Sequence, residues 1–290
     1  MSFAIKVKHC TMQSVRIFFA IIFFIAVGAV TNTTAQGRFS INTSLAAVGG
    51  NFSDSSHNMA YYLYGGLRYQ AQDYYLSLSL PLVFNSSGSF TQLGGMYIPN
   101  GNGNDTGGSM HGSGGQGSMM NGSEGMSSLN AGIGDMYVYG SYTLINETNS
   151  LPAFSTDGFV KFPTASSALN IGTGKFDFNL AVSVRKFIGT FLFFVQGGYL
   201  FLGNSGESNI ENPITFSAGI GNNFGSRKHL FLLEYDSYST IVTGFASPKQ
   251  LSLGYTYFIN PELSFTTIGS AGLNSSTSDY IISAGFNFNL

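Results

Sequence analysis

Charged side chains are scarce in this sequence. Asp, Glu, Lys and Arg together make up 9% of the 290 residues, against about a quarter in ordinary soluble proteins. The formal net charge is only -2, so electrostatics give no reason to expect nucleic acid as a partner. Outside the N-terminal region there is no apolar run of about 20 residues, which excludes helical membrane spans from the rest of the chain. Few charges, no such runs and 15% aromatic residues fit a β-barrel better than a soluble globule.

Cysteine and histidine are also rare, and this excludes most reactive sites. The one cysteine, Cys10, lies in the N-terminal region, so a chain cleaved after that region has no disulfide framework and no thiol chemistry. Three histidines follow it, His57, His111 and His229. None has a serine and an acidic residue placed with it as a serine hydrolase requires. We therefore expect a protein that is not an enzyme and needs no cofactor.

The N-terminal region has the organisation of a secretory signal. Basic residues, an apolar stretch and small residues follow one another at Lys6, Lys8, Arg16, residues 17–30 and Thr34-Ala35-Gln36. This order predicts a signal peptide over residues 1–35, cleaved after Ala35. The alternative is a retained membrane anchor, for which the apolar stretch is short. Residues 36–290 are then the exported part.

Short segments of alternating apolar and polar residues fill the exported part. The last one is the clearest: apolar residues stand at Tyr280, Ile282, Ala284, Phe286, Phe288 and Leu290, and Ser283, Gly285, Asn287 and Asn289 stand between them. A strand with one apolar and one polar face suits a transmembrane barrel, because lipid requires apolar side chains outside and a lumen accepts polar ones. We predict twelve such strands, at residues 39–48, 61–69, 74–84, 134–144, 153–162, 177–187, 191–202, 214–224, 229–238, 250–258, 263–273 and 280–290. The predicted fold class is all-β, a transmembrane antiparallel up-and-down β-barrel.

Two alternatives stay open at this point. Ten or fourteen strands are possible, because residues 90–98 could pair inside a long link. A soluble β-sandwich would alternate as well, but its solvated faces would be plainly polar, with Lys, Glu and Thr. Here the second face carries mainly Ser, Gly, Asn and Tyr, which favours the barrel.

The links between the predicted strands are alternately short and long. The long ones include residues 85–133, 163–176, 203–213 and 239–249. Outer-membrane barrels have short periplasmic turns and longer extracellular loops, so we expect both termini of the barrel in the periplasm and an extracellular loop at residues 85–133. The predicted location is the outer membrane of a Gram-negative bacterium. The predicted partners are the lipid bilayer, a small-molecule solute and the barrel-assembly machinery, whose signal the final Phe288-Asn-Leu290 resembles.

Alternation places most charged side chains of the strands inside the barrel. The inward candidates are Arg38, Arg68, Asp135, Asp157, Lys161, Asp177, Arg185, Glu234 and Asp236. A cation on the lipid face would cost roughly 2–4 kcal/mol at the midplane. These residues either form a selectivity lining or pair with one another and fill a narrow barrel. Because their strands are neighbours, we expect Asp135, Asp157, Lys161 and Asp177 to converge.

Five tyrosines are also predicted to point inward. They are Tyr62, Tyr64, Tyr75, Tyr137 and Tyr139, on the second to fourth predicted strands. A tyrosine offers an apolar ring and a hydroxyl, so these side chains can line a path for aromatic or amphipathic solutes. They can equally fill a small barrel.

The link at residues 85–133 is rich in Gly, Ser, Asn and Met. Its possible metal ligands are Met96, Met110, His111, Met119, Met120 and Met126. Thioether sulfur suits copper(I), and imidazole also binds copper, so one hypothesis is surface capture of a soft metal ion. The alternative is a flexible extracellular loop whose methionines are incidental or pack into the barrel mouth.

Four short motifs between residues 130 and 290 resemble a known family. They are Gly132-Ile-Gly-Asp135, Phe159-Val-Lys-Phe-Pro-Thr164, Gly172-Thr-Gly174 and Gly197-Gly-Tyr199, and they are similar to the outer-membrane transporter family of the meta-pathway of phenol degradation. The resemblance implies uptake of small aromatic or hydrophobic compounds. The first functional hypothesis is thus a passive outer-membrane channel. The alternatives are metal capture by the methionine-rich loop and a structural barrel with a plugged lumen.

Overall fold

The computed structural model describes residues 37–51, 57–85, 90–99, 130–166, 171, 173–203 and 210–290. The predicted signal peptide and most of the link at residues 85–133 lie outside these ranges. Arg38–Leu290 form one structural unit. Within its described part, no helix has the length and apolar character needed to cross a membrane.

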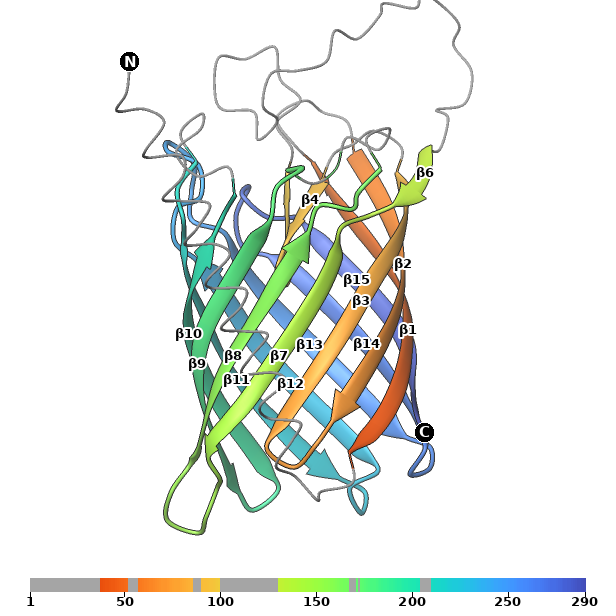
Figure 1. Ribbon diagram of the computed structural model, residues 1–290, viewed down its shortest axis with the longest axis vertical. Coiled ribbons are helices and arrows are strands. Elements are labelled where there is room, and N and C mark those ends of the chain that lie inside the picture. The colour runs from red at the N-terminus through yellow and green to blue at the C-terminus, as the bar shows by residue number, and fades with distance from the viewer. Residues whose placement is uncertain are drawn as a thin grey trace, which may run out of the picture. The chain divides into compact units, whose positions relative to one another are not determined.

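An antiparallel barrel with twelve strand positions forms this unit (Figure 1). Its strands are β1 (Arg38–Asn51), β2 (His57–Gln70), β3 (Tyr74–Asn85), β6 (Asn130–Ile133), β7 (Met136–Ile145), β8 (Ala153–Phe162), β9 (Asp177–Ile188), β10 (Phe191–Phe201), β11 (Ile214–Phe224), β12 (His229–Tyr238), β13 (Lys249–Phe258), β14 (Leu263–Gly272) and β15 (Tyr280–Asn289). The thirteen strands occupy twelve positions because β6 and β7 both pair with the same side of β3. β1 pairs with β2 and with β15, which closes the ring. The predicted all-β barrel of about twelve strands is confirmed.

The alternation pattern located most strands well. β8, β11 and β12 have the predicted limits, and the other ends differ by a few residues. The strands predicted at residues 39–48 and 61–69 were too short, since β1 and β2 stay paired as far as Asn51 and His57.

The prediction of one strand at residues 134–144 was wrong at its start. The chain leaves the regular ladder at Gly134 and Asp135, which separates β6 from β7. Gly134 keeps one backbone bond there, donating its N–H to the carbonyl oxygen of Pro81 at 2.8 Å. Asp135 is buried, 8% exposed, and its carboxylate serves a cluster of charges inside the barrel. Asp135 nevertheless stays on the inner side of the barrel, where alternation also placed it.

Most outward positions of the strands hold apolar side chains that other protein atoms do not cover. Leu45, Val182 and Ile282 are 53%, 56% and 60% exposed. Side chains of this kind are buried in a soluble protein and face lipid in a membrane barrel. With the closed ring, this surface makes the protein a β-barrel of the bacterial outer membrane.

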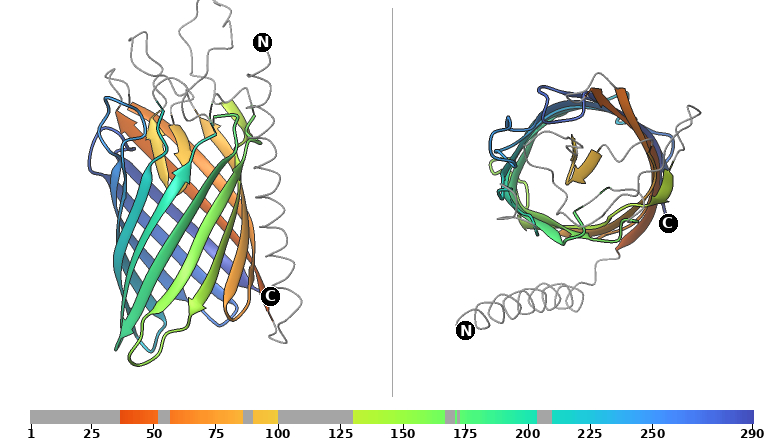
Figure 2. Two further views of the ribbon diagram at one scale, coloured as in Figure 1. Left: turned by 60° about the vertical axis from the view of Figure 1, so that its left-hand side comes forward. Right: turned by 90° about the horizontal axis from the view of Figure 1, so that it is seen from above.

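A two-stranded hairpin lies inside the ring. β4 (Phe90–Leu93) pairs with β5 (Met96–Pro99) across the turn Gly94-Gly95. Gly94 has a φ of 62°, in the left-handed region that favours glycine. The view from above shows the hairpin within the barrel (Figure 2). Residues 90–98 thus do pair with each other, the possibility that the sequence left open, but they add no strand to the barrel.

The two faces of the hairpin pack against opposite parts of the inner wall. One cluster consists of Ala46, Val48, Ala60, Tyr62, Val83, Phe90, Tyr97 and Ile281. The other consists of Leu93, Met96, Leu200, Leu202, Ile98, Ile210, Tyr238 and Ile241. Because both faces of the hairpin are buried, it spans the lumen near the long-link end. This apolar core lies inside the barrel and fixes the hairpin in place.

Closure of the ring gives a first test. Gly285 of β15 is paired with Ser44 of β1, and a Cβ at position 285 would lie 2.9 Å from the Cα of Ser44 and even nearer to the carbonyl oxygen of Thr43. We expect Gly285→Val to separate the two strands and reduce the yield of folded barrel, measured by the heat-dependent shift in gel mobility. Gly269→Val is the matched control, since no atom lies within 4 Å of a Cβ there. Equal folding of the two variants would contradict the close approach at this seam.

Candidate functional site

The hairpin is held to the barrel by tyrosine hydroxyls from three strands. Tyr64 of β2 donates to the side-chain oxygen of Gln92 at 2.9 Å. Tyr137 of β7 donates to the backbone oxygen of Gln92 at 2.8 Å, and Tyr238 of β12 donates to the backbone oxygen of Leu93 at 3.1 Å. Each bond gives a carbonyl oxygen of the hairpin a hydrogen-bond donor from the barrel wall. The hairpin is therefore anchored at the turn end from several sides.

Further contacts fix the second strand of the hairpin. The hydroxyls of Tyr64 and Tyr97 are hydrogen-bonded to each other, and the ring of Tyr62 lies 4.9 Å from that of Tyr97. On the other side, the backbone N–H of Ser278 donates to the carbonyl oxygen of Tyr97 at 3.0 Å. A hydrogen bond to a buried backbone group typically contributes about 1 kcal/mol, so this set holds the hairpin firmly against the wall.

The five predicted inward tyrosines fall into two groups. Tyr62, Tyr64 and Tyr137 contact the hairpin. Tyr139 is the next inward residue below Tyr137, stacked on it at 5.7 Å and tilted against Phe159 at the same distance. Tyr75 lies on β3 under the guanidinium of Arg68, 4.1 Å from the ring centre. Whether these tyrosines line a solute path stays a prediction, but three of them have a structural partner that the sequence did not show.

Three of the four inward charges expected to converge do so. Lys161 of β8 is fully buried, and its ammonium group is 3.5 Å from a carboxylate oxygen of Asp135 and in contact with Asp177 of β9. It also donates to the hydroxyl of Thr173 at 2.9 Å. Backbone N–H groups complete the cluster, from Ala165 to Asp135 at 3.0 Å and from Gly203 to Asp177 at 3.0 Å. We call Asp135, Lys161 and Asp177 the ion triad.

Asp157 does not join the ion triad, contrary to the prediction. It lies four residues from Lys161 along β8, a separation of about 13 Å in a strand. Its carboxylate instead accepts a hydrogen bond of 2.5 Å from the hydroxyl of Ser183. Asp157 and the ion triad share the inner wall, because their strands are neighbours and their side chains are on one face. They lie at different depths in the barrel.

The remaining inward charges are spread round the ring. Arg38 and Arg185 are exposed on β1 and β9, and Arg68 donates to the side chain of Gln70 at 2.7 Å. Glu234 and Asp236 are half-buried on β12, and Asp236 accepts a hydrogen bond of 2.5 Å from Ser217. None of these five forms an ion pair with another described residue, so they differ from the ion triad. Their role in selectivity stays a prediction.

Polar side chains that the sequence analysis did not single out continue the inner wall beyond β12. Gln250 donates to the hydroxyl of Ser252 at 3.1 Å, and that hydroxyl is 2.9 Å from the hydroxyl of Ser270. Thr256 and Thr266 are hydrogen-bonded to each other at 2.9 Å. The sequence signal that could have identified these residues is the alternation along β13 and β14, because each of them stands between two outward positions.

The methionine-rich link is mostly beyond what the structure describes. Met110, His111, Met119, Met120 and Met126 lie outside the described residues. Met96 belongs to the hairpin, is 1% exposed and packs among apolar side chains. Within the described ranges, no group of three or more His, Cys, Asp or Glu residues could hold a metal ion. The hypothesis of metal capture by the other residues stays a prediction.

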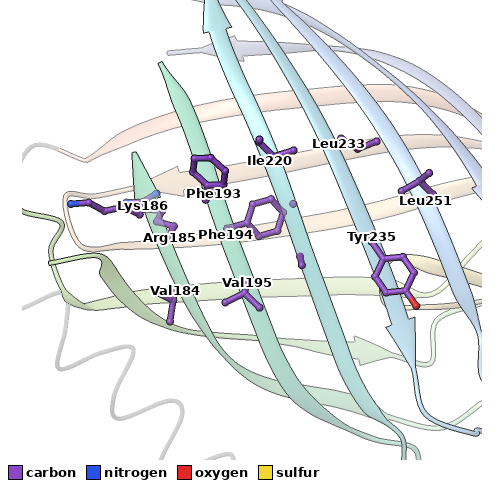
Figure 3. Close-up of a pocket in the computed structure, with 12 residues that line it drawn as sticks. Val184, Arg185, Lys186, Phe193, Phe194, Val195, Ile220, Leu233, Tyr235 and Leu251 are labelled. Atoms are coloured by element: carbon purple, nitrogen blue, oxygen red, sulfur yellow. The ribbon is translucent and has the colours of Figure 1, made fainter. Parts of the chain in front are cut away.

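A groove of about 500 Å³ lies over strands β9 to β13 (Figure 3). It is lined by Val184, Arg185, Lys186, Phe193, Phe194, Val195, Ala218, Gly219, Ile220, Leu233, Tyr235 and Leu251. Most of these residues occupy outward positions of their strands. The groove therefore lies mainly on the lipid-facing side, and Arg185, Phe194 and Gly219 are its residues at inward positions.

Comparisons with known proteins support the fold and no closer relationship. No protein-family model matches the sequence, and no curated protein matches it. A crystal structure of an outer membrane channel from Pseudomonas putida F1 is similar with a TM-score of 0.55 and 10% identity over 89% of this chain and 96% of that one. The KdgM porin is similar with a TM-score of 0.50 and 10% identity over 87% and 99%. The CymD monoaromatic hydrocarbon channel is similar with a TM-score of 0.42 and 11% identity over 90% of each chain.

At about 10% identity the first two likenesses show the barrel fold alone. They agree with the fold that the resemblance to the phenol-degradation transporter family implied. Membership of that family stays a hypothesis.

The ion triad gives a test of stability. Lys161→Ala would leave Asp135 and Asp177 buried without their cation, and removing one partner of a buried ion pair costs about 3–5 kcal/mol. We expect a loss of that order in the free energy of unfolding, measured by urea titration of the refolded barrel. Lys186→Ala is the control, because its ion pair with Glu147 is partly exposed and such pairs contribute about 1 kcal/mol or less.

The triple variant Lys161→Met, Asp135→Asn, Asp177→Asn separates charge from packing. It removes the cation and both carboxylates together, so it should recover much of the stability lost in Lys161→Ala. If Lys161→Ala were no less stable than Lys186→Ala, the ion triad would not contribute as described.

Proposed function

We propose that the protein is a passive channel of the outer membrane for small solutes that carry an apolar or aromatic body. The observation that carries the proposal is the hairpin β4–β5, which narrows the lumen at the long-link end instead of leaving a wide pore. An eight-stranded barrel is filled by its own side chains, whereas larger barrels enclose a cavity or a channel. A twelve-stranded barrel with an inserted hairpin fits a narrow, selective path.

The inner wall just below the hairpin is the part of the lumen that suits a solute with an apolar or aromatic body. Tyr139 and Phe159 lie there side by side on β7 and β8, and Tyr75 continues the same wall on β3 toward the short-link end. Aromatic rings give an incoming ring offset-stacked or edge-on contacts. The polar side chains of β12 to β14 keep the other side of the lumen wettable. The channels named above, from Pseudomonas putida F1 and the KdgM porin, agree with transport as the kind of function.

Removing the hairpin tests the channel. We expect replacement of residues 90–99 by a short Gly-Ser linker to raise single-channel conductance several-fold in planar bilayers, because the segment that spans the lumen is gone. The matched control is a deletion of ten residues elsewhere in the same link, residues 103–112, which should leave the conductance of the open barrel close to that of the unaltered protein.

The outcomes distinguish a channel from a plugged barrel. Conductance in the unaltered protein supports the channel. Current only after removal of the hairpin would mean that the lumen is plugged, and no current in either protein would reject transport altogether.

The aromatic wall gives a second test. We expect Tyr139→Ser to lower the permeation rate of a small aromatic solute relative to a sugar of similar mass by about two- to ten-fold, since an aromatic contact is worth about 0.5–1.5 kcal/mol. The ratio is measured in liposomes that contain the refolded protein. Tyr199→Ser is the control, because Tyr199 is 40% exposed at an outward position of β10. An unchanged ratio in the Tyr139 variant would remove this wall from the solute path.

A further inference from the structure

The lumen has two chemically different walls at one depth, just below the hairpin. Tyr137 and Tyr238 both bond the hairpin turn, from β7 and β12. The next inward residue toward the short-link end is Tyr139 on β7 and Asp236 on β12, each about 7 Å lower by the rise of a strand. Aromatic side chains therefore lie below the hairpin on one wall, and a carboxylate lies below it on the other.

Glu234 follows Asp236 as the next inward residue on β12. The inward cation in register with Glu234 is Arg185, three strands away on β9. On the six described strands β10 to β15, Glu234 and Asp236 are inward carboxylates, and no Lys or Arg occupies an inward position. The residues paired with them across the strands are Ser217 and Gly219 on β11 and Gln250 and Ser252 on β13. The inward arginines lie on β1, β2 and β9 instead.

An unsatisfied oxygen beside this pair indicates a missing donor. Gln250 is directly opposite Asp236 in the pairing of β12 with β13, and both side chains take inward positions. Gln250 is 4% exposed, yet its side-chain oxygen has no hydrogen-bond partner among the described residues. A buried acceptor without a donor costs about 1–3 kcal/mol. A ligand that donates N–H bonds would satisfy it.

An aromatic ring borders the same place on the other side. Gly219 is paired with Glu234, and the ring of Phe194 on β10 covers Gly219 so closely that a Cβ there would be 2.6 Å from the end of that ring. Phe194 is thus held beside the position of Glu234. A ring face next to carboxylates is an arrangement that suits an organic cation.

We propose that Glu234 and Asp236, with the amide oxygen of Gln250, determine the charge of the transported solute and favour small compounds with a protonated amine on an apolar or aromatic body. The ammonium group contacts the carboxylates and donates to Gln250, while the apolar body passes along Tyr139 and Phe159. Two carboxylates on one strand offer too few ligands for the usual six to eight of calcium, which favours an amine over a metal ion. The inference rests on the proposed channel function and adds the solute class to it.

The experiment measures reversal potentials across planar bilayers that contain the full-length refolded protein, in a gradient of benzylammonium chloride at neutral pH. Only charged species carry current, so diffusion of neutral benzylamine through the lipid does not contribute. The unaltered protein is expected to prefer benzylammonium to chloride. The double variant Glu234→Gln, Asp236→Asn keeps the shapes of the side chains and the acceptor for Ser217, and it should lose that preference several-fold.

Two controls separate this effect from others. Glu262→Gln removes one carboxylate at the exposed turn between β13 and β14 and should leave the preference unchanged. Benzyltrimethylammonium has the same charge and ring but no N–H, so the unaltered protein should prefer it less than benzylammonium. Heat-dependent gel mobility shows that each variant has folded.

The outcomes distinguish this inference from the channel itself. No current from the unaltered protein or from the protein without the hairpin would reject the channel, and this inference with it. If only the protein without the hairpin conducts, the carboxylate variants are compared in that protein. Current without a preference for benzylammonium, or with a preference that survives in the double variant, would overturn the assignment to Glu234 and Asp236 and leave the channel standing.

Discussion

The pairing of the first strand with the last is the constraint on which the rest of the structure depends. Lipid offers no hydrogen bonds, so each backbone N–H and C=O at membrane depth must find a partner in the protein. β1 and β15 meet this demand along ten paired positions from Ser40 to Gly49. Closure in turn fixes the perimeter and creates an interior that twelve strands do not fill with their own side chains. The inner surface must therefore accommodate an inserted segment, a solute path or both.

The hairpin β4–β5 fills part of that interior by combining two kinds of contact. It carries apolar side chains on both faces, and it buries Phe90 toward one wall and Leu93 and Met96 toward the other. Its backbone carbonyl groups near the turn are polar and face the barrel wall, where they accept hydrogen bonds. Tyrosine meets both needs, since its ring packs with the apolar side chains and its hydroxyl donates to a carbonyl oxygen. Phenylalanine at position 137 or 238 would pack in the same way but would remove the hydrogen bond to the hairpin.

Sequence alone predicted the wall of the barrel far better than its contents. Alternation is a local property, and in β8, β11 and β12 it gave the strand limits directly. The hairpin also had a local signal, since Gly94-Gly95 between two apolar runs is typical of a tight hairpin turn. Its place inside the lumen depends on contacts between residues more than 100 positions apart, such as Tyr238 and Leu93, and no periodicity encodes those.

The candidate site shows the same limit at the level of single residues. Alternation assigned the ion triad to one face, and the triad formed because Asp135, Lys161 and Asp177 also share a depth. It assigned Asp157 to that face too, but could not show that register places Asp157 beside Ser183 instead. The unsatisfied side-chain oxygen of Gln250 could not be predicted from the sequence for a similar reason. It can be recognised only when every possible donor around it has been located.

The two sets of inward carboxylates illustrate how context decides the role of a charge. In the ion triad a buried ammonium pairs with Asp135 and Asp177, and each carboxylate also accepts a backbone N–H, so these charges are occupied within the protein. On β12 the residues paired with Glu234 and Asp236 are uncharged, and in the function that we propose the field of the two carboxylates acts on the solute that enters the lumen. An aromatic wall beyond them provides contact for an apolar body but does not offset that charge. A barrel with one wall of each kind can select a solute by charge at one side and by shape at the other, without any change in its fold.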